Sequence, residues 1–108
     1  MTTFDEREQN FEKKFKHDQE LRFKTNARRN KLLGLWAAAR MGLTGSDADA
    51  YAISVVEADL GRPNGAGARN KVMKDIAAKG TATSEAEVQH EQDRLLAVAK
   101  EQILKEQA

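Results

Sequence analysis

The sequence predicts an all-α protein: a four-helix bundle preceded by a charged, weakly packed N-terminal helical segment. Two observations favour this class. Apolar residues recur every three or four positions through most of the chain, and capping residues and glycines stand where helices would begin and end. A third observation is negative, because the alternating patterns, β-branched runs and hairpin dipeptides typical of strands are missing from the sequence.

Residues 1–18 are interpreted as a segment distinct from the bundle. All four phenylalanines of the chain lie in the highly charged stretch "TFDEREQNFEKKFKHDQELRFK". On a helix with about 100° per residue, Phe4, Phe11 and Phe15 fall within about 40° of one another. A helix that packs on its own domain usually has an apolar arc of about 100° or more. The narrow stripe favours a helix that binds in a partner's groove through aromatic anchors; packing of the rings on their own bundle is the alternative.

Residues 19–108 are predicted to form the bundle, with helices at roughly 20–42, 46–61, 66–79 and 84–106. The first of these helices is apolar around much of its circumference, which is typical of a central position. Gly34 costs this helix ~1 kcal/mol relative to alanine, so we expect another backbone to pass close to it. Gly42 and Gly45 are expected to end it.

The second helix is expected to begin at Ser46, with Asp49 three residues on in a variant of the capping box. Gly61 and Pro63 are expected to end it, glycine in the left-handed position and proline because it cannot continue a helix. One face of it carries a stripe at three-to-four spacing: Ala48, Tyr51, Ala52, Val55, Val56 and Asp59. The third helix is predicted in "NGAGARNKVMKDIAAKG", closed by Gly80.

Ser84 and Glu87 form a capping box that predicts the start of the fourth helix. We expect Trp36 to be a core residue, because the helix around it is apolar on most sides. The predicted core contains no phenylalanine and consists of Leu32, Leu33, Leu35, Trp36, Met41, Leu43, Tyr51, Val55, Val56, Leu60, Val72, Ile76, Val88, Leu95, Leu96 and Ile103.

Composition predicts a soluble, cytoplasmic protein. The 108 residues include no cysteine and one proline, which excludes a disulfide framework and zinc-type Cys/His spacing. The first residues do not resemble a secretory signal. The longest apolar run, residues 32–39, is far shorter than the ~20 residues that cross a bilayer.

The sequence contains no recognisable catalytic, metal-binding or cofactor-binding motif, so we expect no enzyme activity. His17 and His90 have no partner at metal-ligand spacing and are interpreted as surface residues. Glycines between 61 and 67 precede Lys71, but the G-x-x-x-x-G-K-[ST] pattern and a preceding strand are missing. This stretch is interpreted as a flexible turn rather than a phosphate-binding loop.

The net charge of +1 hides blocks of opposite sign. Residues 21–46 contain six basic and no acidic residues, and residues 47–60 contain four acidic and no basic ones. Such blocks favour helices that attract one another, or a basic face for an acidic partner. A small nucleic-acid-binding or regulatory adaptor protein that uses the block from Arg22 to Arg40 is therefore the alternative function; overall charge near zero argues against it.

Four stretches, "FDEREQNFEKKF", "ARRNKLLGLWAA", "MGL" and "LLAVAKEQI", occur in this order over nearly the whole chain. Together they resemble the ATP synthase inhibitor subunit zeta of alphaproteobacteria. The resemblance implies a four-helix fold with an N-terminal inhibitory segment. It also implies that residues 28–31, Arg-Arg-Asn-Lys, stand at the start of the bundle. It also implies a protein that is monomeric when free, needs no cofactor, and lies at the periphery of the inner membrane when it is bound to ATP synthase.

The resemblance further implies that the N-terminal helix enters the catalytic head of ATP synthase at an α/β interface near the γ shaft and blocks hydrolysis. Phe4, Arg7, Phe11 and Phe15 fall in the inhibitory motif. Because a buried helix loses the hydration of its charges, Arg7 and Lys13 are expected to find acidic or carbonyl partners in the cleft. The sequence differs from the family pattern at Lys16, where a small residue is expected.

Overall fold

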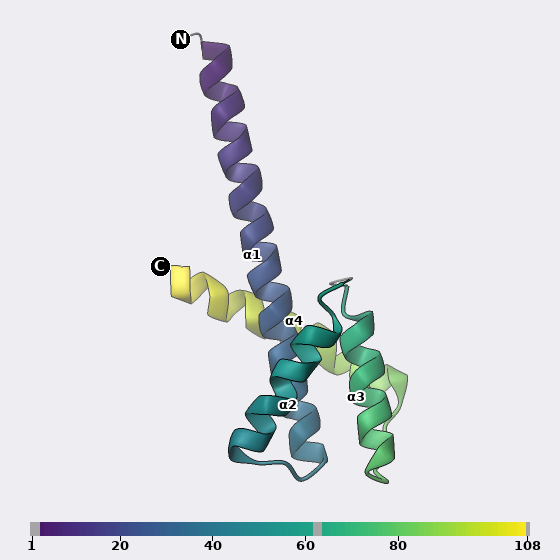
Figure 1. The fold of residues 1–108 in the computed structure, drawn as a ribbon. Helices are drawn as coiled ribbons and strands as arrows, with labels where there is room; N and C mark the ends of the chain where they lie inside the picture. The colour runs from purple at the N-terminus through teal and green to yellow at the C-terminus, as the bar shows by residue number, and fades with distance from the viewer. Residues whose placement is uncertain (1–2, 62–63, 108) are drawn as a thin grey trace.

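Four helices form the fold, which confirms the predicted all-α four-helix class. The computed structural model describes residues 3–61 and 64–107, and the side chains of these residues except 3–8 and 11. The helices are α1 (Thr3–Arg40), α2 (Gly45–Ala58), α3 (Ala66–Ala78) and α4 (Glu85–Gln107). Figure 1 shows α2, α3 and α4 gathered around the C-terminal half of α1, while its N-terminal half extends away from them. The molecule therefore measures 64 × 24 × 20 Å.

Helix α1 joins the N-terminal segment and the first bundle helix without interruption. The reason lies in the sequence, because no glycine or proline occurs before Gly34 to break the helix. The helix ends where Gly42 adopts a left-handed φ of +79°. The N–H of Gly42 then donates to the carbonyl of Ala39, and the N–H of Leu43 to that of Ala38. This is the Schellman pattern, in which glycine ends a helix at no steric cost.

The predicted start of the second helix is within one residue of the observed one, but its predicted end and the caps predicted at both ends were wrong. Helix α2 begins at Gly45 after an extended Thr44, so Ser46 lies inside it rather than capping it. It ends at Ala58, with Asp59 as its C-cap in right-handed conformation. Gly61 lies three residues after the end of this helix and does not have the left-handed φ expected of a capping glycine. Pro63 lies outside the described residues.

Two capping signals predicted the end of α3 and the start of α4, and the structure confirms both. Gly80 closes α3 with a φ of +78°, and its N–H donates to Ala77 O at 3.0 Å. Ser84 Oγ accepts a hydrogen bond from the N–H of Glu87 at 3.1 Å, as a capping box requires. Both signals are local in sequence, which explains why they could be read without knowing the fold.

The core lies between the C-terminal half of α1 and the other three helices. Its buried cluster consists of Leu33, Ala37, Val55, Ala68, Val72, Ile76, Val88 and Leu95. The predicted core residue Leu60 was wrong, since it is 53% exposed beyond the end of α2. Trp36 packs against the cluster but is only partly buried, and the guanidinium of Arg40 lies 4.4 Å from its ring centre. Alanines take a larger share of the core than predicted, because they let helices approach closely.

Gly34 marks a close approach of α1 to the backbone of α2, as expected. A Cβ atom added at Gly34 would lie 2.6 Å from Cα of Ala52 and 3.2 Å from the Val55 side chain. Both neighbours are buried and belong to α2. The contact is therefore backbone against backbone, and a larger side chain can be accepted only if the two helices separate.

We expect Gly34→Ala to destabilise the protein although alanine is the better helix former. The gain in helix propensity of ~1 kcal/mol is opposed by overpacking that costs about 1–3 kcal/mol, and contact with backbone atoms favours the upper end. Gly61→Ala is the matched control, because a Cβ there meets nothing within 4 Å. Chemical denaturation of both variants checks this; a Gly34→Ala protein more stable than its parent would show that the helices can separate freely.

Candidate partner-binding site

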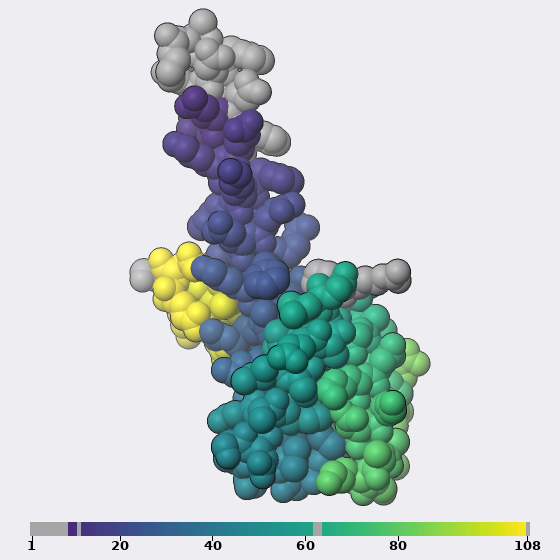
Figure 2. Space-filling model, in the orientation of Figure 1, coloured from purple at the N-terminus to yellow at the C-terminus, as the bar shows by residue number. Residues whose placement is uncertain are grey.

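The N-terminal half of α1 stands clear of the other helices. Figure 2 shows it as a single column of side chains above the compact part of the molecule. Every described side chain between residues 9 and 20 is exposed, whereas Leu21 is partly buried and Thr25 is buried. Burial therefore begins at Leu21 and is complete at Thr25, whose hydroxyl donates within α1 to the carbonyl of Leu21 at 2.7 Å.

Two of the predicted site residues have described side chains in this half. Phe15 is 55% exposed, and Lys13 is also exposed. They do not share a face, because residues two apart on a helix point in different directions. Phe4, Arg7 and Phe11 belong to α1 by their backbone, and their side chains lie outside the described residues.

The base of this half is fixed to α4 through Arg28. Its guanidinium donates to Gln102 Oε1 at 2.8 Å and to Glu106 Oε1 at 2.7 Å. The next two residues, Arg29 and Asn30, are buried. Two side chains of α4 held by one planar guanidinium define the angle between α1 and α4 better than a single point charge would. Arg28 therefore adds a polar contact to the packing of α1 against α4 at the base of the projecting half.

A buried carboxylate, Asp59, lies just after the end of α2 and is only 1% exposed. It stands at the N-terminal end of α3, where a helix has free N–H groups and a positive dipole. Its oxygens accept hydrogen bonds from the N–H groups of Gly65 and Gly67 at 3.1 Å and of Ala68 at 3.4 Å, and from Asn30 Nδ2 at 2.9 Å. Asp59 thus joins the end of α2 to the start of α3 and to α1.

Arg29 provides the counter-charge to this carboxylate. Its Nη2 lies 3.6 Å from Asp59 Oδ2, and its Nε donates to Asn30 Oδ1 at 3.2 Å. Burial lowers the pKa of Arg29, while the negative charges of Asp59 and Asp93 oppose that shift. Since an arginine stays protonated in proteins, the two buried groups form an ion pair that depends on both partners.

The turn before α3 is built into the same network. Gly65, at a φ of +88°, offers its carbonyl to Gln92 Nε2 at 2.8 Å, and Gln92 Oε1 accepts from Arg69 Nη1 at 3.0 Å. A Cβ at Gly67 would lie 2.3 Å from the carbonyl oxygen of Ala58. The glycines therefore allow α3 to pack closely against the end of α2. The N–H groups at the start of α3, which a phosphate would need, already donate to the Asp59 carboxylate.

Sequence reasoning did not identify this cluster. Its one signal was that Asp59 falls on the same stripe of α2 as the buried Ala52 and Val55. An acidic residue at a core position implies buried donors around it, but the sequence does not say where those donors come from.

A second polar contact links α2 to α3 at the surface. The Tyr51 hydroxyl donates to Asp75 Oδ2 at 2.8 Å, and Lys71 Nζ lies 3.0 Å from the same oxygen. Burial, followed by the bond to Asp75, raises the pKa of Tyr51. Burial alone would raise the pKa of Asp75, but the hydrogen bonds from Tyr51 and Lys71 outweigh it and the net shift is downward. These groups hold two helices together in stable charge states.

The two histidines lie at the surface, as the sequence predicted. His17 and His90 are exposed. Within the described ranges, no group of three or more His, Cys, Asp or Glu residues could hold a metal ion. The same part of the chain has no helix that is long and apolar enough to cross a bilayer.

Half of the basic block that suggested nucleic-acid binding is paired with acids of this chain. Three of its arginines are paired with acids of other helices: Arg28 with Glu106, Arg29 with Asp59, and Arg40 with Glu87. Paired arginines offer less positive potential to phosphates than free ones. This argues against the nucleic-acid-binding alternative.

Comparisons with known proteins agree with the sequence resemblance. Residues 1–102 match the family described as ATPase inhibitor subunit zeta. A protein of known solution NMR structure is 43% identical, with 80% of this chain and 98% of that chain covered and a TM-score of 0.69. No curated protein matches. Because the family match spans nearly the whole chain, the protein belongs to the ATPase inhibitor subunit zeta family.

Proposed function

We propose that the protein inhibits ATP hydrolysis by inserting the N-terminal half of α1 into the catalytic head of the F-type ATP synthase. The entry site is an α/β interface near the γ shaft, where a rigid helix would oppose rotation in the hydrolytic direction. The single observation that carries this proposal is that α1 continues as a helix beyond the bundle, with every described side chain between residues 9 and 20 exposed.

The geometry suits insertion in two ways. Residues 3–20 span about 27 Å at about 1.5 Å per residue, enough to reach into a cleft while the bundle stays outside. The segment is already helical in the free chain, so binding need not supply the whole cost of ordering it. The functional division is therefore into residues 1–18, which insert, and residues 19–108, which carry and direct them.

The residues proposed to make the contact are Phe4, Arg7, Phe11, Lys13 and Phe15. Aromatic side chains contribute most where a partner's pocket encloses them completely, and Phe15 is 55% exposed to solvent. The charges of Arg7 and Lys13 require acidic or carbonyl partners in the cleft, because a buried charge without a partner costs several kcal/mol.

Titration of ATP hydrolysis by the cognate catalytic head tests this proposal. We expect Phe15→Ala to raise the concentration for half-inhibition at least about tenfold, since ~1.4 kcal/mol corresponds to that factor and an aromatic anchor contributes ~2 kcal/mol or more. Phe11→Ala is expected to act in the same way. Lys16→Ala, which restores the small residue of the family pattern, should change inhibition little or improve it.

Phe23→Ala is the matched control, because Phe23 is 58% exposed on the same helix but lies beyond the inserted segment. Circular dichroism confirms that each variant is folded. If Phe15→Ala and Phe23→Ala inhibit as strongly as the parent, the segment does not bind through its aromatic stripe.

A further inference from the structure

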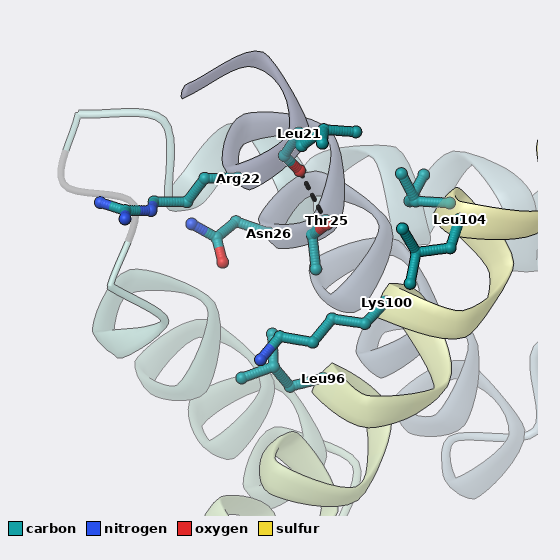
Figure 3. A pocket seen from close by; sticks show the side chains of 8 residues that line it. Leu21, Arg22, Thr25, Asn26, Leu96, Lys100 and Leu104 are labelled. Atoms are coloured by element: carbon teal, nitrogen blue, oxygen red, sulfur yellow. Dashed lines mark hydrogen bonds between the residues drawn. The ribbon is translucent and has the colours of Figure 1, made fainter. Parts of the chain in front are cut away.

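An apolar groove opens where the C-terminal part of α4 crosses α1, at the base of the projecting half. Its volume is about 480 Å³. Figure 3 shows side chains of the two helices lining it from opposite sides. The apolar lining includes Leu21 of α1 and Leu96, Ile103 and Leu104 of α4. Leu104 is 62% exposed, although leucine is usually buried in a domain of this size.

The charged residues that line this groove are both basic. Arg22 comes from α1 and Lys100 from α4, and both side chains are exposed. The remaining polar lining is neutral, from Thr25 and Asn26. An apolar floor with positive charges at its edges is complementary to a surface with apolar residues flanked by acidic ones.

The groove continues the surface that the proposed function assigns to the partner. At about 100° per residue, Phe15, Arg22 and Asn26 fall on one face of α1. Arg22 is about 10 Å from Phe15 along the helix axis. A partner element that covers Phe15 therefore meets one edge of the groove next along the same face, and Leu21 and Thr25 lie about 120° and 80° farther around the helix.

We propose that this groove receives an amphipathic helix of the catalytic head, with apolar residues on one face and acidic residues beside them. A helix is the fitting element because the α4 residues 96, 100, 103 and 104 form a ridge at three-to-four spacing, against which another helix can pack. The proposal rests on the proposed function. It adds a second contact, outside the inserted segment, that holds the bundle against the rim of the cleft.

Site-specific cross-linking tests the contact directly, because the chain contains no cysteine. A photoreactive maleimide is attached at Leu104→Cys in the full chain and irradiated with the purified head. We expect a product with a head helix rich in acidic residues, identified by mass spectrometry. Glu12→Cys reports the inserted segment, and Ile53→Cys, 54% exposed on α2, is the matched negative control.

The outcomes separate the two proposals. Products at residue 12 but none at residue 104 overturn the groove contact and leave the inhibitory mechanism standing. Products at neither position overturn both. A product of Leu104→Cys with a second copy of this chain, or with a head segment that lacks acidic residues, also overturns the assigned occupant.

Affinity for the head provides the second test. We expect Leu104→Ser to weaken binding of the full chain about tenfold, a loss typical of an interface anchor. Lys100→Glu should slow association and reduce its dependence on salt, since charges at a rim steer the encounter. Ile53→Ser and Lys74→Glu, at exposed positions on α2 and α3, should leave the affinity for the head and the association rate unchanged. If the Leu104 and Lys100 variants bind like these controls while Phe15→Ala binds weakly, the groove is not part of the interface.

Discussion

Asp59→Ala is expected to destabilise the protein by about 3–5 kcal/mol, the range found when one partner of a buried charge pair is removed. The substitution leaves three backbone N–H groups at the start of α3 without their acceptor. It also leaves the buried Arg29 guanidinium without its nearest counter-charge. Each unsatisfied buried group adds its own desolvation cost, so the effects on the two helices reinforce each other.

A loss of this size is a large share of the 5–15 kcal/mol that stabilises a typical domain. Thermal unfolding should show it as a fall in Tm of about 15 °C or more, since 1 kcal/mol shifts Tm by about 4–8 °C in a domain of about this size. Asp49→Ala is the control, because Asp49 is an exposed acid of α2, the helix that Asp59 follows. It should change stability by no more than about 0.5 kcal/mol. A parent-like Tm for Asp59→Ala would mean that water replaces the carboxylate easily.

Asp59 also shows where prediction from the sequence reached its limit. Helix periodicity and capping residues are local signals, and they identified four helices, the close approach at Gly34 and the cap at Ser84. The partners of Asp59 are Asn30 of α1 and the N-terminal end of α3 at residues 65–68, which are distant from it in sequence or follow a loop. Periodicity carries no information about such pairs. The stripe containing Asp59 could indicate burial but not the role of the buried group.

Continuity of α1 was missed for a different reason. The boundary at residue 18 was drawn from the change in apolar content, and a change in burial does not require a change in backbone conformation. The structure shows one helix whose surroundings change near Leu21. The aromatic stripe and the charges around it were visible in the sequence, whereas the groove beside Leu104 was not, because it needs the crossing of α1 and α4.

Deletion of residues 1–18 is expected to abolish inhibition of ATP hydrolysis while the bundle remains folded. Every residue of the core cluster lies at or after Leu33, and the earliest described buried side chain is Thr25. The deletion therefore removes no described buried side chain, and exposed ends of this kind contribute little to stability. We expect the Tm of residues 19–108 to stay within a few degrees of that of the intact chain.

Inhibition, in contrast, should lose its main source of binding energy. Phe4, Phe11 and Phe15 are all removed by the deletion. With about 2 kcal/mol or more for each enclosed aromatic anchor, two of them already correspond to roughly several hundredfold in affinity. The measurement is the hydrolysis rate of the cognate head titrated with intact and shortened protein, with circular dichroism and thermal unfolding as folding controls. If the shortened, folded protein inhibits as well as the intact chain, the inhibitory surface lies in the bundle. The concentration of phenylalanines in the most charged stretch of the sequence would then require another explanation, since neither the core nor the partner would use them.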